Sequence, residues 1–335
     1  MAAQAPAFWQ RRGALARILL PLSWLFGVLA ARRRTAIEPQ RLAVPVIVVG
    51  NIAVGGSGKT PVVEWLANLL REAGHRPGII SRGHGGRISA DGGVAQVPCD
   101  GDPDLHGDEP VLLARLTRCP LVIGRDRPAA GRELLRLHPD VDVLIADDGM
   151  QHYRLARDIE IAVVDEATLG NHLLLPAGPL REPLARLGEV DLILAHGRLS
   201  PAVHAAVGRV PMFTMALSGG ELRAVAAPEP SRPASDFRGR RVHAVAGIGR
   251  PQRFFEQLAG EGIEVVPHPF PDHHRFVADD LAFDETLPIL MTAKDAVKCA
   301  AFAPADCWEY PVRAQIGSGA AERILEKLED GRTSA

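Results

Sequence analysis

A glycine-rich segment ending in Lys59 and Thr60 has the residue types needed to hold a nucleotide phosphate. The β-branched run Val46–Val49 before it is typical of a buried parallel strand, and a helical pattern begins at Lys59. Backbone N–H groups of the turn and the helix N-terminus can converge on an anion, Lys59 can reach the outer phosphates, and Thr60 offers a hydroxyl to Mg²⁺. Ala53 stands where glycine is usual. The predicted NTP site comprises Ala53, Val54, Gly55, Gly56, Ser57, Gly58, Lys59 and Thr60.

Two adjacent carboxylates, Asp147 and Asp148, follow the apolar run Val141–Ala146. The run is typical of a buried strand. In proteins with a phosphate loop, an aspartate at the end of a later strand organises Mg²⁺. Neighbouring residues of a strand point to opposite faces, so we expect only one of the two carboxylates to face the metal.

An acidic pair, Asp108 and Glu109, precedes Pro110 and a helical pattern over Val111–Leu116. Acids just ahead of a proline in the first turn are ordinary helix caps, and the pattern alone favours that role. A carboxylate at a helix start beside phosphates could instead accept a proton from a hydroxyl nucleophile. Both roles of Asp108 are open at this point.

A proline-braced loop over residues 174–183 presents Arg181 and Glu182. Proline stiffens a loop, which suits a residue that must be held in place, and an arginine beside a transferring phosphoryl group stabilises its charge. A surface ion pair is the equally weighted alternative.

A second polar group, Asp272, His273 and His274, follows His268 in the last third of the chain. An aspartate beside a histidine is typical of an orienting group and a base, or of half a metal site. No cysteine and no H-x-x-x-H spacing accompanies these residues, so the sequence does not favour zinc.

The elements that would position these side chains alternate between strands and helices, which predicts a parallel α/β sheet flanked by helices. Ligands bind beyond the carboxyl ends of the strands in such sheets. Arg125 and Arg127 follow the end of one predicted strand. The predicted strands are 46–49, 77–81, 121–124, 141–146, 159–164 and 190–195.

The composition changes over residues 226–241, which are rich in proline, serine and arginine and predict a linker. A smaller βαβ pattern follows, with strands at 243–246 and 263–266 and a helix at 251–260. Gly247 and Gly249 lack the third glycine of a dinucleotide fingerprint and are interpreted as a tight turn. We therefore expect an N-terminal helix within 1–40, a phosphate-loop domain over 41–225 and a smaller α/β domain over 242–335.

Charge and cysteine content narrow the class of protein. The net charge of −2 over 335 residues gives no nucleic-acid footprint. Residues 1–41, however, hold seven arginines against one acid, a local charge of +6, so the remainder carries about −8. Four cysteines without C-x-x-C spacing predict reduced cytosolic thiols.

The uncharged run Ile18–Ala31 lies between arginines. As a helix of 14 residues it would extend about 21 Å, short of the roughly 30 Å hydrocarbon core of a bilayer. A secretory signal is disfavoured, because an exported protein would find no NTP, and a buried core helix is the main alternative. A helix lying in the membrane interface fits best, with Trp24 and Phe26 in lipid and arginines at anionic headgroups.

Seven motifs in one order, from Gly55 to Lys298, resemble the tetraacyldisaccharide 4′-kinase family of lipid A biosynthesis. They are G-G-S-G-K-T-P, S-R-G-H-G-G, G-D-E-P, D-D-G-M-Q-H, L-L-P-A-G-P-L-R-E-P, F-P-D-H-H and T-A-K-D-A-V-K. The resemblance covers nearly the whole chain, including the basic, apolar N-terminus. It implies an α/β P-loop NTPase fold with a second smaller α/β domain and an N-terminal membrane-interacting helix.

The same resemblance implies that the chain transfers the γ-phosphoryl group of ATP, with Mg²⁺, to the 4′-hydroxyl of an acylated glucosamine disaccharide 1-phosphate, giving lipid IVA. Asp108 would be the catalytic base, assisted by His273 across the domain cleft. Thr60 and Asp147 would hold Mg²⁺, and Asp148 would help to position the base. The other implied site residues are Lys59, Arg125, Arg127, His152, Arg181 and Glu182.

The resemblance also implies a place for the protein, peripheral or monotopic at the cytoplasmic face of the bacterial inner membrane, with no obligate protein partner. Three residues depart from the family pattern: His84 stands for tyrosine, Ala293 for glutamate, and Met150 for phenylalanine or leucine. The alternative function is a membrane-docked P-loop NTPase that acts as a switch or chaperone for a protein partner. A switch needs neither an acceptor cleft nor an Asp/His pair in a second domain.

Overall fold

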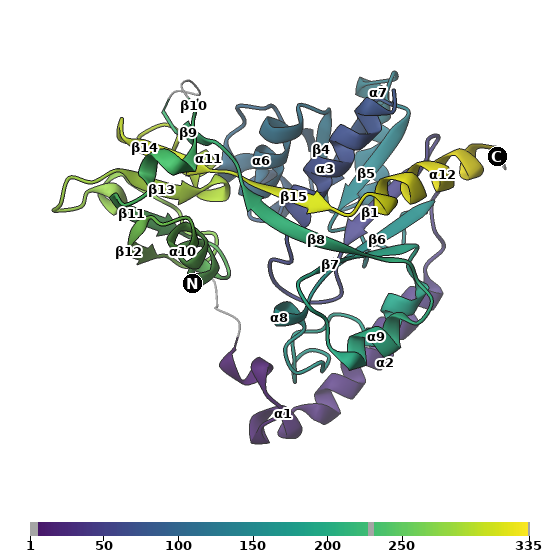
Figure 1. Ribbon diagram of the computed structural model, residues 1–335. Helices are drawn as coiled ribbons and strands as arrows, with labels where there is room; N and C mark the ends of the chain where they lie inside the picture. Colours follow the sequence, from purple (N-terminus) through teal and green to yellow (C-terminus); the bar gives the residue numbers. More distant parts are fainter. Residues whose placement is uncertain (1–5, 227–230, 334–335) are drawn as a thin grey trace.

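Two β-sheets organise the chain in the computed structural model, which describes residues 6–226 and 231–333. Within these residues the larger sheet has nine strands, in the order β15-β8-β7-β6-β1-β5-β2-β4-β3 (Figure 1). Its interior pairs are parallel, and only the edge strands β3 and β15 run antiparallel to their neighbours. The strands are β1 (Val46–Gly50), β2 (Pro77–Ser81), β3 (Val94–Gln96), β4 (Leu121–Gly124), β5 (Val143–Asp147), β6 (Ile159–Asp165), β7 (Leu192–His196), β8 (Met212–Gly219) and β15 (Val312–Ile316).

Helices cover both faces of this sheet, as the near-continuous apolar runs of its central strands require. Leu66, Leu113 and Ile324 belong to the core on one face, and Leu134 and Val203 to the core on the other. Between or beside the strands lie α3 (Lys59–Glu72), α4 (Arg87–Ala90), α5 (Pro103–His106), α6 (Asp108–Thr117), α7 (Arg127–Leu137), α8 (Glu166–Leu169), η2 (Leu184–Glu189), α9 (Pro201–Val207) and α12 (Gly319–Thr333).

The smaller sheet forms a second domain with the strand order β10-β9-β14-β13-β11-β12. Its core includes Phe237, Leu258 and Trp308. The elements are β9 (Leu222–Ala224), β10 (Ser231–Arg232), η3 (Ala234–Phe237), β11 (Arg241–Ala246), α10 (Pro251–Gly260), β12 (Glu264–Pro269), η4 (Ala278–Leu281), β13 (Ile289–Thr292), α11 (Ala293–Cys299) and β14 (Cys307–Tyr310). All four cysteines are free, which confirms the prediction of unpaired thiols.

The domain boundaries differ from those predicted. Strands β9 and β10 fall within or beside the predicted linker but pair in the second sheet, whereas β15 and α12 return to the first sheet and its core. Residues 227–230 of the predicted linker, 1–5 of the N-terminal segment and 334–335 at the C-terminus lie outside the described residues. The return of β15 follows from edge pairing over a long distance, which no local pattern reveals.

Two neighbouring strand connections link the domains, β8 to β9 and β14 to β15 (Figure 1). The backbone N–H of Gly220 donates to the carbonyl of Pro311 at 2.9 Å, so the two connections are held together. Gly219 packs against the ring of Tyr310, and a side chain at position 219 would collide with that ring. The two connections therefore form one narrow crossing between the domains.

The N-terminal segment forms η1 (Ala7–Gln10), α1 (Ala14–Ile18) and α2 (Leu20–Ala36). Ser23 is the buried residue of α2, and its hydroxyl donates to the carbonyl of Leu174 at 2.6 Å. Ile18 and Trp24 are each 72% exposed. The run is therefore not the buried core helix of the alternative interpretation. Among the described helices, none is long and apolar enough to cross a bilayer.

Candidate active site

The predicted phosphate loop lies between the buried strand β1 and helix α3. Gly55 and Gly58 have φ angles of 117° and 84°, a left-handed conformation that glycine adopts without strain. The Asn51 side chain donates to the Ser57 hydroxyl at 3.1 Å and so braces the loop from inside. Ala53, the departure from the common pattern, is buried and forms a β-bridge with Leu180, so its methyl group packs instead of blocking the loop.

Asp148 joins the phosphate loop to the loop that carries Arg181. Its carboxylate lies 3.3 Å from the ammonium of Lys59 and accepts a hydrogen bond from Arg181 at 3.0 Å. Burial alone would raise the pKa of Asp148, but these two cations hold it well below its usual range. The residue has a φ of 47°, which turns its side chain away from that of Asp147. Asp148 is therefore a fixed anion that orients both cations.

Asp147 is the last residue of β5 and pairs in register with Val49 of β1. Its side chain accepts a hydrogen bond from the Ser81 hydroxyl at 2.9 Å. Burial, with the charges of Glu109 and Asp148, raises its pKa to about 6. Within the described residues, no lysine or arginine forms an ion pair with it. A buried carboxylate beside a phosphate loop that makes no direct ion pair fits a divalent metal ion.

Asp108 and His273 meet across the domain cleft although 165 residues separate them. His273 Nδ1 lies 2.9 Å from Asp108 Oδ2, and the aspartate is 6% exposed. Burial alone would raise the pKa of Asp108, but the hydrogen bond with His273 and the charge of Lys294 lower it to about 2. The same hydrogen bond raises the pKa of His273. We call Asp108 and His273 the dyad.

The helix-cap interpretation of Asp108 is only partly right. Helix α6 begins at Asp108 itself, and Gly107 before it caps the helix with no side chain. Asp108 Oδ1 accepts the backbone N–H of Glu109 at 2.9 Å, which satisfies one donor of the first turn. Oδ2 is left for His273, so the helix start orients the carboxylate that faces the cleft.

Lys294, which the sequence analysis did not single out as a site residue, anchors the acids around the dyad. Its ammonium lies 3.1 Å from Glu109, 3.2 Å from Asp272 and 3.8 Å from Asp108. Burial would lower its pKa, but these carboxylates raise it above its usual value. Its motif T-A-K-D-A-V-K is one of those that carry the family resemblance. Its partner Glu109, however, lies 185 residues away along the chain, so no local pattern predicts the contact. A cavity of about 310 Å³ adjoins the dyad and is also lined by Gly85, Lys298 and Phe276.

Arg127 and His152 lie on the buried side of the aspartate pair. Arg127 is 1% exposed and donates to the carbonyl of Gly124 at 2.6 Å. Burial lowers its pKa to about 10, against the opposing effect of Asp147 and Asp148. Burial and the charge of Arg127 lower the pKa of His152 to about 3, so its imidazole is neutral. Arg125 has an exposed side chain, and among the described contacts none ties it to this group.

Arg181 and Glu182 do not form the surface ion pair of the alternative interpretation. Arg181 turns to Asp148, whereas Glu182 is buried and accepts hydrogen bonds from Tyr153 and, at 2.8 Å, from Gln151. Gln151 also accepts from Arg181 at 3.3 Å. Glu182 thus holds the loop that places Arg181.

The second-domain histidines do not form a metal site in the part of the chain that the structure describes, where no cluster of three or more His, Cys, Asp or Glu could hold an ion. His274 pairs instead with Asp280 at 2.9 Å. His84, a departure from the family pattern, packs edge-on against His273 with ring centroids 5.4 Å apart. Burial lowers the pKa of His84, which keeps a second positive charge away from the dyad.

Comparison with known proteins shows the family of the chain. The family model described as tetraacyldisaccharide-1-P 4′-kinase matches residues 15–329. A tetraacyldisaccharide 4′-kinase of Aromatoleum aromaticum is 62% identical over 340 residues, covering 100% of both chains. One of Azoarcus sp. is 63% identical over 339 residues, covering 99% of this chain and 97% of that one. A crystal structure of LpxK from Aquifex aeolicus in complex with ATP superimposes with a TM-score of 0.78 at 30% identity, covering 94% of this chain and 99% of that one.

Proposed function

Because the chain belongs to the tetraacyldisaccharide 4′-kinase family, we propose that it transfers the γ-phosphoryl group of ATP to the 4′-hydroxyl of a tetraacylated glucosamine disaccharide 1-phosphate. The observation that carries the proposal is the meeting of Asp108 and His273 at 2.9 Å beside a phosphate loop. A base at that place serves a hydroxyl acceptor, which a nucleotide switch does not have.

The phosphate loop and its neighbours hold the nucleotide in this proposal. Lys59 turns from Asp148 to the outer phosphates, while Arg181 stays with Asp148. The Thr60 hydroxyl and the Asp147 carboxylate would hold Mg²⁺, which when bound would supply positive charge to the phosphate oxygens. Arg127 adds a buried positive charge behind the aspartates, and the neutral His152 adds no second one.

The dyad removes the proton from the acceptor. Asp108 accepts the hydroxyl proton, and a neutral His273 shares it, which makes a carboxylate of low pKa effective as a base. Lys294 and its acidic neighbours fix the pair, so that little reorganisation is needed during transfer.

The activity is tested with purified protein, Mg·[γ-³²P]ATP and the acylated disaccharide 1-phosphate in mixed micelles. We expect label in the lipid. Release of labelled phosphate at the same rate without lipid, and no labelled lipid, would contradict the kinase and favour the switch or chaperone ATPase.

The N-terminal segment would bring this site to its lipid substrate at the cytoplasmic face of the inner membrane. Ile18, Leu22, Trp24 and Leu29 are each more than half exposed. Burying a large apolar side chain in lipid contributes roughly 1.5–3 kcal/mol, and an arginine near anionic headgroups about 1 kcal/mol. The segment has both features, which together suffice for attachment without a spanning helix.

Replacing Ile18, Trp24 and Leu29 together by serine should lower binding to vesicles with anionic headgroups by at least tenfold, since three exposed apolar contacts with lipid are lost. Vesicle flotation measures the bound fraction. Turnover with a soluble, short-chain acceptor should stay near wild type. Leu137→Ser with Val277→Ser, which removes exposed apolar groups elsewhere, is the control. Equal binding of the triple variant and the control would contradict attachment through α1 and α2.

The pH dependence of kcat should report the protonation of His273. The hydrogen bond with Asp108 raises its pKa above the usual 6.5, and only neutral imidazole can take the proton. We expect kcat to rise with pH through that raised pKa and then to level off. His273→Ala should remove this limb at a lower kcat, and Asp108→Asn should move it to lower pH. A limb unchanged in His273→Ala would assign it to another group.

A further inference from the structure

One face of α6 carries Asp108 at its first turn and Arg115 two turns later. Residues seven apart in a helix lie on the same face, about 10 Å apart along the axis. Both contact the second domain: Asp108 meets His273, and Arg115 Nη2 lies 2.7 Å from Glu309 Oε2. The second domain therefore forms ion pairs with both ends of α6, and the dyad lies at only one of these ends.

Glu309 is the last-but-one residue of β14, and its side chain is completely buried. Burial raises its pKa, against the charges of Arg115 and Arg223. Arg223 faces it across the β9–β14 pairing. Separating a buried ion pair leaves an uncompensated buried charge, which is strongly destabilising. The contact between Arg115 and Glu309 is therefore energetically favoured.

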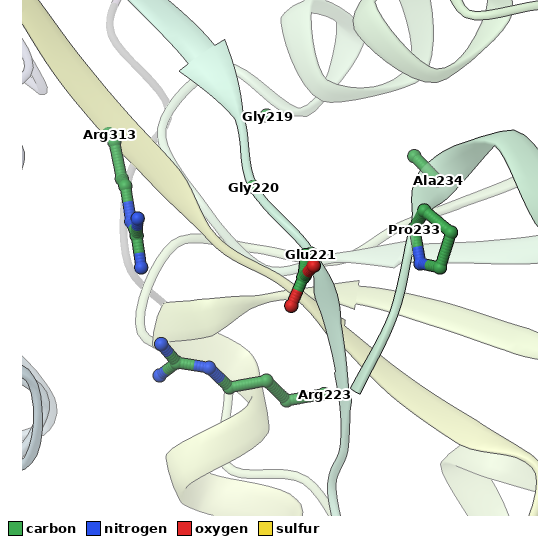
Figure 2. Close-up of a pocket in the computed structure, with 7 residues that line it drawn as sticks. All are labelled: Gly219, Gly220, Glu221, Arg223, Pro233, Ala234 and Arg313. Atoms are coloured by element: carbon green, nitrogen blue, oxygen red, sulfur yellow. The ribbon is translucent and has the colours of Figure 1, made fainter. Parts of the chain in front are cut away.

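This ion pair lies beside the crossing between the domains. Tyr310 and Pro311 follow Glu309 and lead directly into β15 of the first sheet. Arg223 of β9 and Arg313 of β15, each just beyond a crossing connection, line a groove of about 490 Å³, and Figure 2 shows both side chains. Burial raises the pKa of Glu64 on α3, the helix that starts at Lys59, against the opposing charges of both arginines. Charged groups of both α3 and α6 therefore act on residues beside the crossing, Glu64 through Arg223 and Arg115 through Glu309.

We propose that Arg115 and Glu309 are positioning residues, which set the angle of the second domain on α6 and thereby bring His273 to Asp108. The proposal rests on the proposed function for its kinetic consequence, but not for its geometry. A small change of angle at the crossing becomes a larger displacement at the far end of α6, where the dyad lies. An ion pair beside the crossing can therefore control the dyad without touching the substrates.

Replacing Arg115 by methionine keeps most of the apolar stem and removes the cation. We expect kcat to fall at least tenfold, the KM for ATP to stay within about twofold, and the pKa of His273, followed by NMR of its ring, to fall toward 6.5, because it separates from Asp108. Arg115→Lys, which keeps a cation, should retain most of kcat. Arg136→Met is the matched control, since it breaks an exposed ion pair of 2.8 Å with Glu133 within α7.

The single variant leaves Glu309 buried without the Arg115 cation, which destabilises the fold, so Arg115→Met is also combined with Glu309→Gln. This neutral pair removes the uncompensated charge. The double variant should fold and still show the lower kcat and the lower pKa of His273. Wild-type kcat and pKa in either folded variant would overturn the proposal. If wild-type protein fails to phosphorylate the lipid, the proposed function fails, but the pKa of His273 still tests the positioning role.

Discussion

Lys59→Ala is expected to abolish phosphoryl transfer while leaving the protein folded. The ammonium lies at the start of α3, at the mouth of a loop whose glycines point backbone N–H groups at an anion. In the proposed function it is the side-chain charge that reaches the outer phosphates, so its loss would fall on the transition state. Removing one stabilising donor from such a site typically lowers kcat by about 10²–10³. Because Lys59→Ala removes a full charge, we expect a loss of kcat at or above the upper end of that range.

The fold should tolerate this change because Lys59 has little packing role. Its partner Asp148 keeps the hydrogen bond with Arg181, so no carboxylate is left uncompensated. The measurement is kcat with labelled ATP, next to thermal unfolding of the same sample. The control is Lys327→Ala on the distant helix α12, which breaks the ion pair between Lys327 and Asp191. A folded Lys59→Ala protein with kcat within tenfold of wild type would remove the assigned role of the phosphate loop.

The parts of this site that could be predicted from the sequence are those that a short segment builds alone. The phosphate loop needs only strand β1, a few glycines and the start of α3, all within residues 46–60. The same holds for Asp147, whose place follows from the end of a buried strand. The orientation of Asp148 could not be predicted, because it depends on the positive φ of this residue and on its contacts with Lys59 and Arg181.

Contacts between residues far apart in the chain could not be predicted from the sequence. Lys294 lies 185 residues from Glu109, and no periodicity indicates that the two touch. The return of β15 and α12 to the first sheet, and hence the burial of Glu309 at the crossing, likewise depend on tertiary pairing. His273 was predicted as a partner of Asp108 only through the family resemblance. Residue type alone allowed a base, a metal ligand or neither.

The dyad is expected to behave as one catalytic unit. A sugar hydroxyl is a poor nucleophile at neutral pH, and a positioned base is typically worth about 10²–10⁴ in rate. Asp108→Asn keeps the shape of the side chain but removes its basicity, and His273→Ala removes the group that shares the proton. Each should lower kcat by at least about 10² on the same estimate. Because both variants disable the same proton transfer, the kcat of the double variant should be only a few-fold below that of the less active single variant.

A double-mutant cycle on kcat, with both substrates saturating, measures this coupling. His274 and Asp280 provide a matched control, since they form a pair of the same 2.9 Å length within the second domain. Their variants should leave kcat within about threefold of wild type, because the pair lies outside the proton path. Fully multiplicative losses for Asp108 and His273 would mean independent roles, such as His273 binding a substrate phosphate while Asp108 works alone. Near-wild-type kcat in Asp108→Asn would leave that carboxylate as the orienting group of the first turn of α6, through its bond with the N–H of Glu109.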